Sequence, residues 1–118
     1  MKKISEKICI ITEDILSRHK AQNIIKINMK KKSSLADYMI ICSGTSSRHV
    51  VALSNYLKEE LKKINLSLLQ VEGRKGGDWI LVDAGDVIIH LFKSEVRDYY
   101  NLEKMWEYEI NDNVSINS

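Results

Sequence analysis

The sequence WILVDAGDVIIHLF, residues 79–92, decides the fold of this chain. Two hydrophobic runs rich in β-branched residues flank the pair Ala84-Gly85, and this pattern predicts a β-hairpin. If Ala84-Gly85 is the two-residue loop, Trp79 pairs with His90 across the hairpin. Because side chains alternate along each strand, the hairpin then has two faces of different composition.

One face of this predicted hairpin is purely aliphatic and is expected to line the core. It consists of Ile80, Val82, Val87, Ile89 and Leu91. The other face carries large amphipathic residue types, which are common at interfaces. It consists of Trp79, Leu81, Asp83, Asp86, Ile88, His90 and Phe92. We interpret this second face as an interface, with burial under a helix of the same chain as the alternative.

Length and composition limit the class of protein. A chain of 118 residues with 44% hydrophobic residues suits one domain with a real core. The formal net charge of +2 is lower than that of a typical nucleic-acid-binding domain. Cys9 and Cys42 lie outside any metal-ligand spacing, so we expect reduced, buried thiols and neither a metal nor a cofactor. No signal peptide or membrane-spanning run is expected, which predicts a cytoplasmic protein.

The remaining elements follow from residue periodicity. We predict a helix to about residue 20, strands at 24–29 and 38–42, a helix after Ser46 or Ser47, and a strand at 66–71. The first helix is expected to dock through a stripe of isoleucines: Ile4, Ile8, Ile11 and Ile15. The second is expected to dock through Val50, Leu53, Leu57, Leu61 and Ile64. With the hairpin, this order predicts an α/β protein with a mixed sheet of about five strands flanked by helices.

The turn before the second helix invites two interpretations. It reads Gly44, Thr45, Ser46, Ser47 and Arg48, so backbone N–H groups, hydroxyls and a guanidinium could gather around an anion. The alternative, which we favour, is a helix cap after a sharp turn, because a phosphate-binding loop usually carries more glycine and a lysine.

Two further motifs have structural explanations that we favour over functional ones. Gly73-Arg74-Lys75-Gly76 has the GxxG form of a nucleic-acid clamp, but it leads into a strand rather than joining two helices. Asp83 and Asp86 flank the hairpin turn, where carboxylates usually hydrogen-bond the local backbone. We therefore assign no catalytic residue.

A series of ordered motifs between about residues 4 and 106 resembles the ribosomal silencing factor family, RsfS, also called Iojap-like. These motifs are Leu35-Ala36-Asp37-Tyr38, Ser43-Gly44-Thr45-Ser46-Ser47-Arg48-His49-Val50, Glu72-Gly73, Trp79-Ile80-Leu81-Val82-Asp83, Gly85-Asp86-Val87-Ile88-Ile89-His90-Leu91-Phe92, Arg97, Tyr100 and Leu102-Glu103-Lys104-Met105-Trp106. Ala84 and Val51 depart from the family pattern, in which an aromatic and a charged residue are common at these positions.

The resemblance implies a nucleotidyltransferase-like α/β fold without transferase activity. It implies a factor that binds the large ribosomal subunit through large-subunit ribosomal protein fourteen and blocks subunit joining when nutrients are scarce. A nucleotide-binding or nucleotidyltransferase-like enzyme is the alternative. The resemblance leaves open a homodimer and a contact with ribosomal RNA. From the residues alone, a third hypothesis is a small RNA-binding module using Lys30-Lys31-Lys32 with Arg74 and Lys75, which a net charge of only +2 disfavours.

The resemblance also implies which residues meet the partner. They comprise residues on the second, amphipathic face of the hairpin, the Asp37-Tyr38 segment and two later tyrosines: Trp79, Leu81, Ile88, His90, Phe92, Asp37, Tyr38, Tyr99 and Tyr100. We expect residues 1–106 to form a single domain and residues 107–118 to be a polar C-terminal tail.

Overall fold

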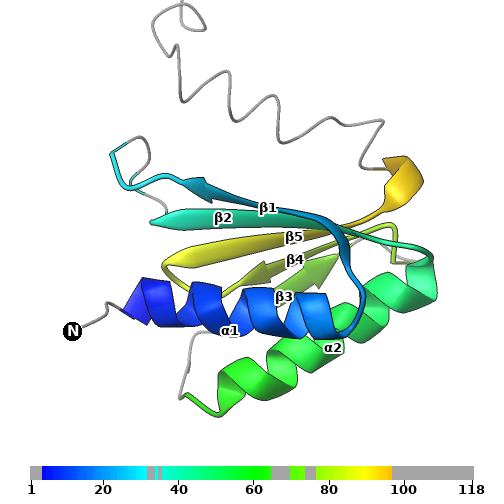
Figure 1. Ribbon diagram of the computed structural model, residues 1–118, viewed down its shortest axis with the longest axis horizontal. Helices are drawn as coiled ribbons and strands as arrows, with labels where there is room; N and C mark the ends of the chain where they lie inside the picture. The colour runs from blue at the N-terminus through cyan, green and yellow to red at the C-terminus, as the bar shows by residue number, and fades with distance from the viewer. Residues whose placement is uncertain (1–3, 32–33, 35, 65–69, 74–76, 97–118) are drawn as a thin grey trace, which may run out of the picture.

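Five strands form one mixed sheet in the computed structural model, which describes residues 4–31, 34, 36–64, 70–73 and 77–96 (Figure 1). The strands are β1 (Gln22–Asn28), β2 (Tyr38–Gly44), β3 (Gln70–Gly73), β4 (Trp79–Asp83) and β5 (Val87–Lys93). Their order across the sheet is β1-β2-β5-β4-β3. β2 and β5 run parallel, and the other neighbouring pairs run antiparallel. The α/β class and the mixed sheet are therefore confirmed.

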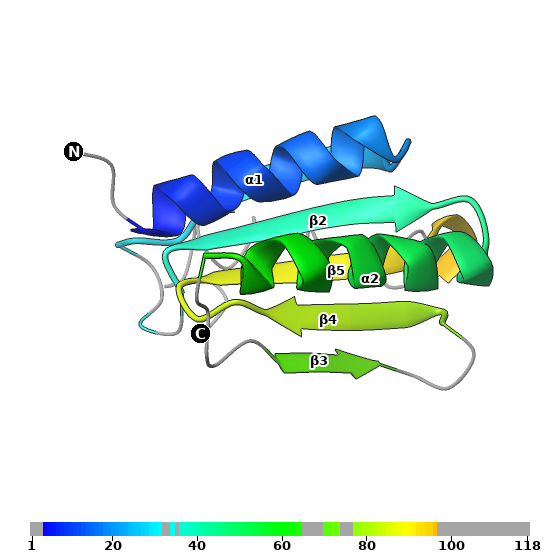
Figure 2. The same cartoon turned by 90° about the horizontal axis from the view of Figure 1, so that it is seen from below.

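The helices α1 (Ile4–Arg18) and α2 (Ser47–Lys62) cover the same face of this sheet (Figures 1 and 2). The main core lies between the two layers and includes the aliphatic face of the hairpin, as expected. On α2, Val50, Leu53, Leu57 and Leu61 are buried as predicted, and Ile64 packs against them. This leaves the opposite face of the sheet with a different set of side chains.

Strand β2 is buried along its whole length. All seven of its residues, Tyr38 to Gly44, are buried. A strand in the middle of a sheet contacts neighbours on both faces, which explains why its sequence is almost continuously apolar rather than alternating. The sequence prediction of a strand covered on both faces is confirmed.

The buried stripe of α1 differs from the predicted one. Ile8 and Ile15 are buried, but Ile4 is 45% exposed. The stripe also includes Ser5 and Thr12, whose hydroxyls are buried. Small polar residues can occupy a tightly packed helix face, and hydrophobic periodicity does not register them.

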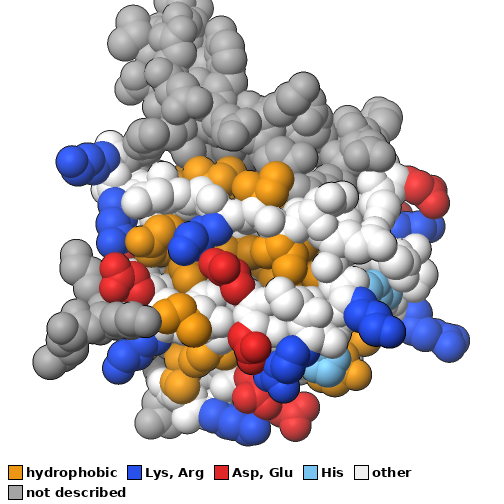
Figure 3. Space-filling model, viewed as in Figure 1, with side chains coloured by type: hydrophobic (Ala, Val, Ile, Leu, Met, Phe, Trp, Pro, Cys, Tyr) orange, Lys and Arg blue, Asp and Glu red, His pale blue; other side chains and the backbone are white. Residues whose placement is uncertain are grey.

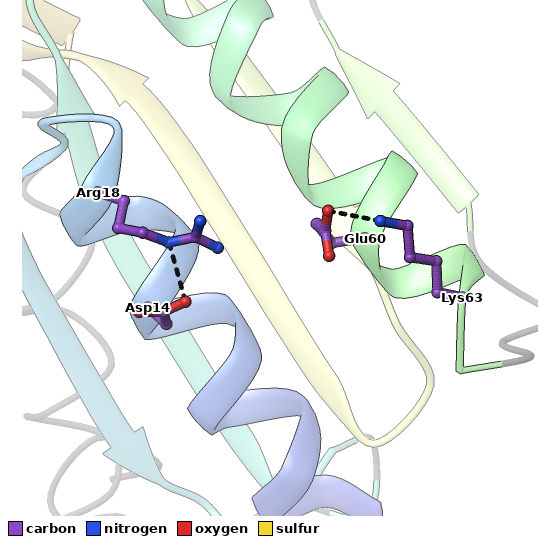
Figure 4. Close-up of polar contacts among 4 residues, drawn as sticks. All are labelled: Asp14, Arg18, Glu60 and Lys63. Carbon is purple, nitrogen blue, oxygen red and sulfur yellow. Dashed lines mark hydrogen bonds and ion pairs between the residues drawn. The ribbon is translucent and has the colours of Figure 1, made fainter.

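Ion pairs stabilise the outward surfaces of the helices (Figure 4). Asp14 pairs with Arg18 at 3.0 Å, one turn apart on α1. Glu60 pairs with Lys63 at 3.0 Å at the end of α2. Exposed pairs of this kind each contribute only about 0.5 kcal/mol, so they favour solubility more than stability. In the view of Figure 3, acidic and basic side chains are interspersed, in agreement with the small net charge.

The predicted hairpin register is wrong by two residues, although the predicted faces are right. Trp79 pairs with Phe92, not with His90, and Leu81 pairs with His90. The turn is formed by Gly85 and Asp86, because the Ala84 N–H donates to the Val87 carbonyl at 2.9 Å. A shift of two residues keeps every side chain on its own face of the sheet.

Strand β3 ends two residues later than predicted, since it extends to Gly73 rather than Val71. Its predicted start at residue 66 lies outside the described ranges, as do all of residues 65–69. The domain boundary predicted at residue 106 and the tail at 107–118 lie there too. The nucleotidyltransferase-like label likewise stays a prediction.

Two glycines adopt left-handed backbone conformations, with φ of +78° at Gly77 and +79° at Gly85. A Cβ on Gly77 would lie 2.9 Å from the Ser47 carbonyl oxygen, whereas one on Gly85 meets nothing within 4 Å. We expect Gly85→Ala to lower the free energy of unfolding by about 1 kcal/mol from backbone strain. Gly77→Ala adds a steric clash and is expected to cost clearly more. Urea unfolding of both variants measures this, and equal losses would contradict it.

Candidate functional site

Three aromatic rings form a compact cluster on the sheet face opposite the helices. The Trp79 and Phe92 ring centroids are 5.7 Å apart, and those of Trp79 and His90 are 5.9 Å apart. His90 and Phe92 are 6.0 Å apart, and all three interplanar angles are 13° or less. The cluster arises from the hairpin register, since Phe92 lies opposite Trp79 and His90 is the diagonal neighbour of Trp79.

A hydrogen bond holds the Trp79 indole in this cluster. Trp79 Nε1 lies 3.1 Å from His90 Nδ1. The indole nitrogen can only donate, so Nδ1 accepts and the neutral imidazole carries its proton on Nε2. Burial lowers the pKa of His90 from 6.5 to about 4, which keeps the ring neutral near pH 7. The buried His90 therefore fixes the orientation of the Trp79 ring.

Only part of the predicted contact set offers accessible surface. Trp79, Leu81 and Ile88 are half-buried on this face. His90 is 6% exposed and Phe92 is 2% exposed, and Phe92 belongs to a second buried cluster with Met39 and Ile41. A partner would therefore contact the first three residues directly, whereas His90 and Phe92 support them.

Carboxylates border these apolar residues. Glu72 lies opposite Leu81 on β3, and Asp83 lies two residues further along β4, so both belong to the same face as Trp79. Trp79, Leu81, Glu72 and Gly73 line a shallow hollow of about 280 Å³. We call Trp79, Leu81 and Ile88 with Glu72 and Asp83 the hairpin surface.

The Asp37-Tyr38 segment does not join the hairpin surface. The Tyr38 side chain packs in the core on the helix-covered face, on the other side of the sheet. The Lys26 and Lys30 ammonium groups lie 5.4 and 5.1 Å from its ring centroid. Asp37 is placed by its backbone, whose N–H donates to the Asp86 carbonyl at 2.7 Å. The structure thus separates this segment from Trp79.

The aromatic and basic candidates from other parts of the sequence are only partly described. Tyr99 and Tyr100 lie outside the described ranges, as do Lys32, Arg74 and Lys75. Lys31 is exposed, and Lys30 lies 3.7 Å from the Glu6 carboxylate. This ion pair partly neutralises the basic turn.

The turn before α2 acts as a helix cap. The Ser46 hydroxyl accepts a hydrogen bond from the His49 N–H at 3.1 Å, which satisfies one of the first free donors of the helix. The Ser47 hydroxyl donates to the Asp78 carboxylate at 3.4 Å, which places a negative charge beside this helix end. Thr45 and Arg48 are exposed. With a carboxylate of the chain already beside the helix end, the cap interpretation is favoured over an anion site.

Gly44 permits this turn by bringing α2 close to the sheet. A Cβ at this position would lie 2.8 Å from Val50 Cγ2. The Ser94 hydroxyl also donates to the Gly44 carbonyl at 3.1 Å. The glycine therefore has a packing role that any larger residue would disrupt.

Asp83 serves the hairpin turn, as its sequence position suggested. Its carboxylate accepts a hydrogen bond from the Gly85 N–H at 2.9 Å. The Asp86 carbonyl accepts from the backbone N–H groups of Asp37 and Tyr38. These bonds link the turn to the start of β2.

Sequence reasoning did not single out a histidine bridge between the two helices. His49 Nε2 lies 2.8 Å from the His19 carbonyl oxygen, and its Nδ1 lies 2.9 Å from the Thr45 N–H. The His19 ring stacks on Tyr56 with centroids 3.7 Å apart. These residues are distant in sequence and follow no periodic pattern, so only the fold brings them together.

Within the described ranges no helix has the length and apolar content needed to cross a membrane. In the same residues no three His, Cys, Asp or Glu side chains lie close enough to hold a metal ion.

Comparison with known proteins identifies the family of this chain. The family model described as ribosomal silencing factor during starvation, RsfS, matches residues 2–118. This chain belongs to the RsfS family. The ribosomal silencing factor RsfS of Zymomonas mobilis is 45% identical over 103 residues, which cover 87% of this chain and 77% of that protein.

More distant relatives and a solved structure agree with this assignment. A crystal structure of a protein from Chromobacterium violaceum superposes with a TM-score of 0.83 at 36% identity and covers 91% of this chain and 88% of that one. The mouse protein named mitochondrial assembly of ribosomal large subunit protein 1 is 36% identical over 95 residues, covering 78% of this chain and 42% of its own length. Sequence similarity to this chain thus extends from bacterial RsfS proteins to a mouse protein.

The buried neutral state of His90 predicts how this RsfS chain responds to acid. Because the folded-state pKa of about 4 lies below the unfolded value of 6.5, the unfolded chain binds the proton first as pH falls. We expect this histidine to contribute stability that is complete above pH 6.5 and falls by about 3 kcal/mol at pH 4.

The matched variant is His90→Gln, which keeps a hydrogen-bond acceptor for Trp79 but does not titrate. Its free energy of unfolding is expected to fall less between pH 7 and pH 4 than that of the parent chain. Denaturant titrations at both pH values measure the difference, and parallel acid losses in the two proteins would refute the assignment.

The cap at Ser46 predicts a separate, pH-independent effect. Ser46→Ala removes the acceptor for the His49 N–H and should lower the free energy of unfolding by about 1 kcal/mol. Thermal unfolding of the parent chain and of the variant, with and without inorganic phosphate, distinguishes a helix cap from an anion site. A marked rise in melting temperature of the parent chain with phosphate, absent in the variant, would support an anion site instead.

Proposed function

We propose that this chain is a non-catalytic ribosomal silencing factor that docks on the large ribosomal subunit through the hairpin surface and sterically blocks subunit joining. Large-subunit ribosomal protein fourteen is the proposed contact, nutrient limitation the proposed condition, and the cytoplasm the proposed location. Membership of the RsfS family supports the ribosomal role. The observation that carries the docking site is the half-exposed Trp79 held in place by His90.

The composition of the hairpin surface suits a protein partner. Trp79 combines a large apolar area with a fixed orientation, and tryptophans of this kind commonly dominate binding energy at interfaces. Leu81 lies two residues from Trp79 on β4, and Ile88 lies on β5 opposite Asp83, so all three side chains belong to the same face. Because the indole is already held by His90 and stacked on Phe92, little side-chain entropy is lost on binding.

The charge around this surface suits a basic partner. Glu72 and Asp83 lie beside the apolar residues, on the same face. Proteins that bind ribosomal RNA carry many Lys and Arg residues, which neutralise phosphates. Carboxylates on the rim would steer such a partner and fix its orientation, while the apolar centre supplies most of the affinity.

The proposed mechanism is steric and involves no catalytic step. A folded body with principal extents of 41 × 38 × 22 Å, placed on the subunit-joining surface, would exclude the small subunit by volume alone. Such occlusion requires tight docking in a single orientation. A surface held on three adjacent strands supplies the necessary rigidity, since strands position side chains more precisely than loops.

Trp79→Ala tests the docking surface. We expect the variant to bind isolated large subunits about 30-fold more weakly, a loss of about 2 kcal/mol, because it removes the central anchor. Co-sedimentation of the purified chain with large subunits measures the affinity, and light scattering follows subunit joining.

The matched control is Ile10→Ala, since Ile10 is 50% exposed on α1, in the helix layer. This variant is expected to bind and inhibit like the parent chain. The docking site would be wrong if Trp79→Ala and Ile10→Ala bound equally well. The ribosomal function itself would be wrong if the parent chain neither co-sedimented nor slowed joining.

A further inference from the structure

Strand β3 forms an open edge of the sheet. All four of its residues, Gln70 to Gly73, are exposed, and among the described residues it pairs only with β4. In Figure 2 it lies beyond the area that α1 and α2 cover. The backbone groups on its outer side are therefore available to pair with another strand.

The opposite edge is protected in a way that β3 is not. Strand β1 has an irregular register between Gln22 and Ile25, and Asn23 has a positive φ of 51°. Irregularities of this kind hinder the addition of a further strand. β3 pairs with β4 in regular antiparallel register over all four residues. The two edges thus differ in their capacity for strand addition.

A hollow lies on each face of the sheet beside β3. On the helix side, a hollow of about 550 Å³ is lined by Val51, Val71, Ile80 and the first turn of α2. On the other side lies the hollow of about 280 Å³ beside Trp79 and Leu81. Gly73 and Glu72 border both. Because Gly73 has no side chain that could fill either hollow, both hollows extend to β3 at this residue.

The two hollows favour different side chains. The helix-side hollow is walled by Val51 and Val71, which are 41% and 39% exposed, and it suits an apolar residue. The other hollow combines the Trp79 ring with the Glu72 carboxylate, and Asp83 lies on the same face. Such a site suits Lys or Arg, through cation–π attraction and ion pairing.

We propose that the β3 edge binds an extended segment of another protein in which apolar and basic residues alternate. Such a segment would add a sixth strand to the sheet of five, with main-chain hydrogen bonds to β3. Successive side chains of a strand point to opposite faces, so the apolar residues enter the hollow beside Val51 and the basic ones the hollow beside Trp79. This inference does not rest on the proposed ribosomal function.

The test uses a fluorescein-labelled synthetic peptide of alternating valine and lysine, titrated with the purified full chain. We expect saturable binding by fluorescence anisotropy. Glu72→Lys and Val51→Glu should each weaken it about tenfold, because one reverses the charge and the other places a charge in the apolar hollow. Ile10→Glu, an equally exposed change on α1, should have no effect.

Two control peptides separate strand addition from simple attraction of a cation. One has the same composition with the valines and lysines in two blocks, and the other has every backbone amide methylated. Both are expected to bind at least about tenfold more weakly, because alternation and free N–H groups are lost. Equal binding of either control, a lack of saturation up to about 1 mM, or insensitivity to both variants overturns the proposal.

Discussion

The parallel pairing of β2 with β5 is the constraint on which the rest of the structure depends. The two strands pair from Tyr38 with Val87 to Gly44 with Lys93, at the centre of the sheet. A parallel connection needs a long crossover, and here α2 and the strands β3 and β4 supply it. Because α1 and α2 lie on the same face, one side of the sheet receives most of the buried aliphatic residues, and a smaller cluster with Ile41 lies on the other.

This one-sided packing explains the character of the opposite face. The cluster of Trp79, His90 and Phe92 does not suit an aliphatic core, since a buried indole and imidazole need hydrogen-bond partners. On the other face they satisfy each other, with Trp79 donating to a neutral His90. The same bond that makes burial of the histidine tolerable also orients the tryptophan. Under the proposed docking, stability and binding would therefore depend on the same pair of residues.

The sequence predicted the two faces of the hairpin correctly because a register error of two residues leaves every side chain on its own face. The hairpin pairing was misjudged by two residues, yet Ile80, Val82 and Ile89 still belong to the core. Helix periodicity was less reliable, because Ile4 is exposed while Ser5 and Thr12 are buried. At the candidate site, the sequence identified Trp79 and Leu81 as surface residues but did not distinguish them from the buried His90 and Phe92.

The sequence by itself determined the class of fold, the two unlike faces of the hairpin and the family, since these depend on local residue types and their spacing. Only the tertiary structure decided which residues are accessible. Tyr38 lies on the far side of the sheet from Trp79, and His90 is covered although it shares the face of Leu81. Accessibility depends on what packs around each residue, and residue periodicity does not specify those contacts. For the same reason, only the fold shows that β3 is an edge with a hollow on each side.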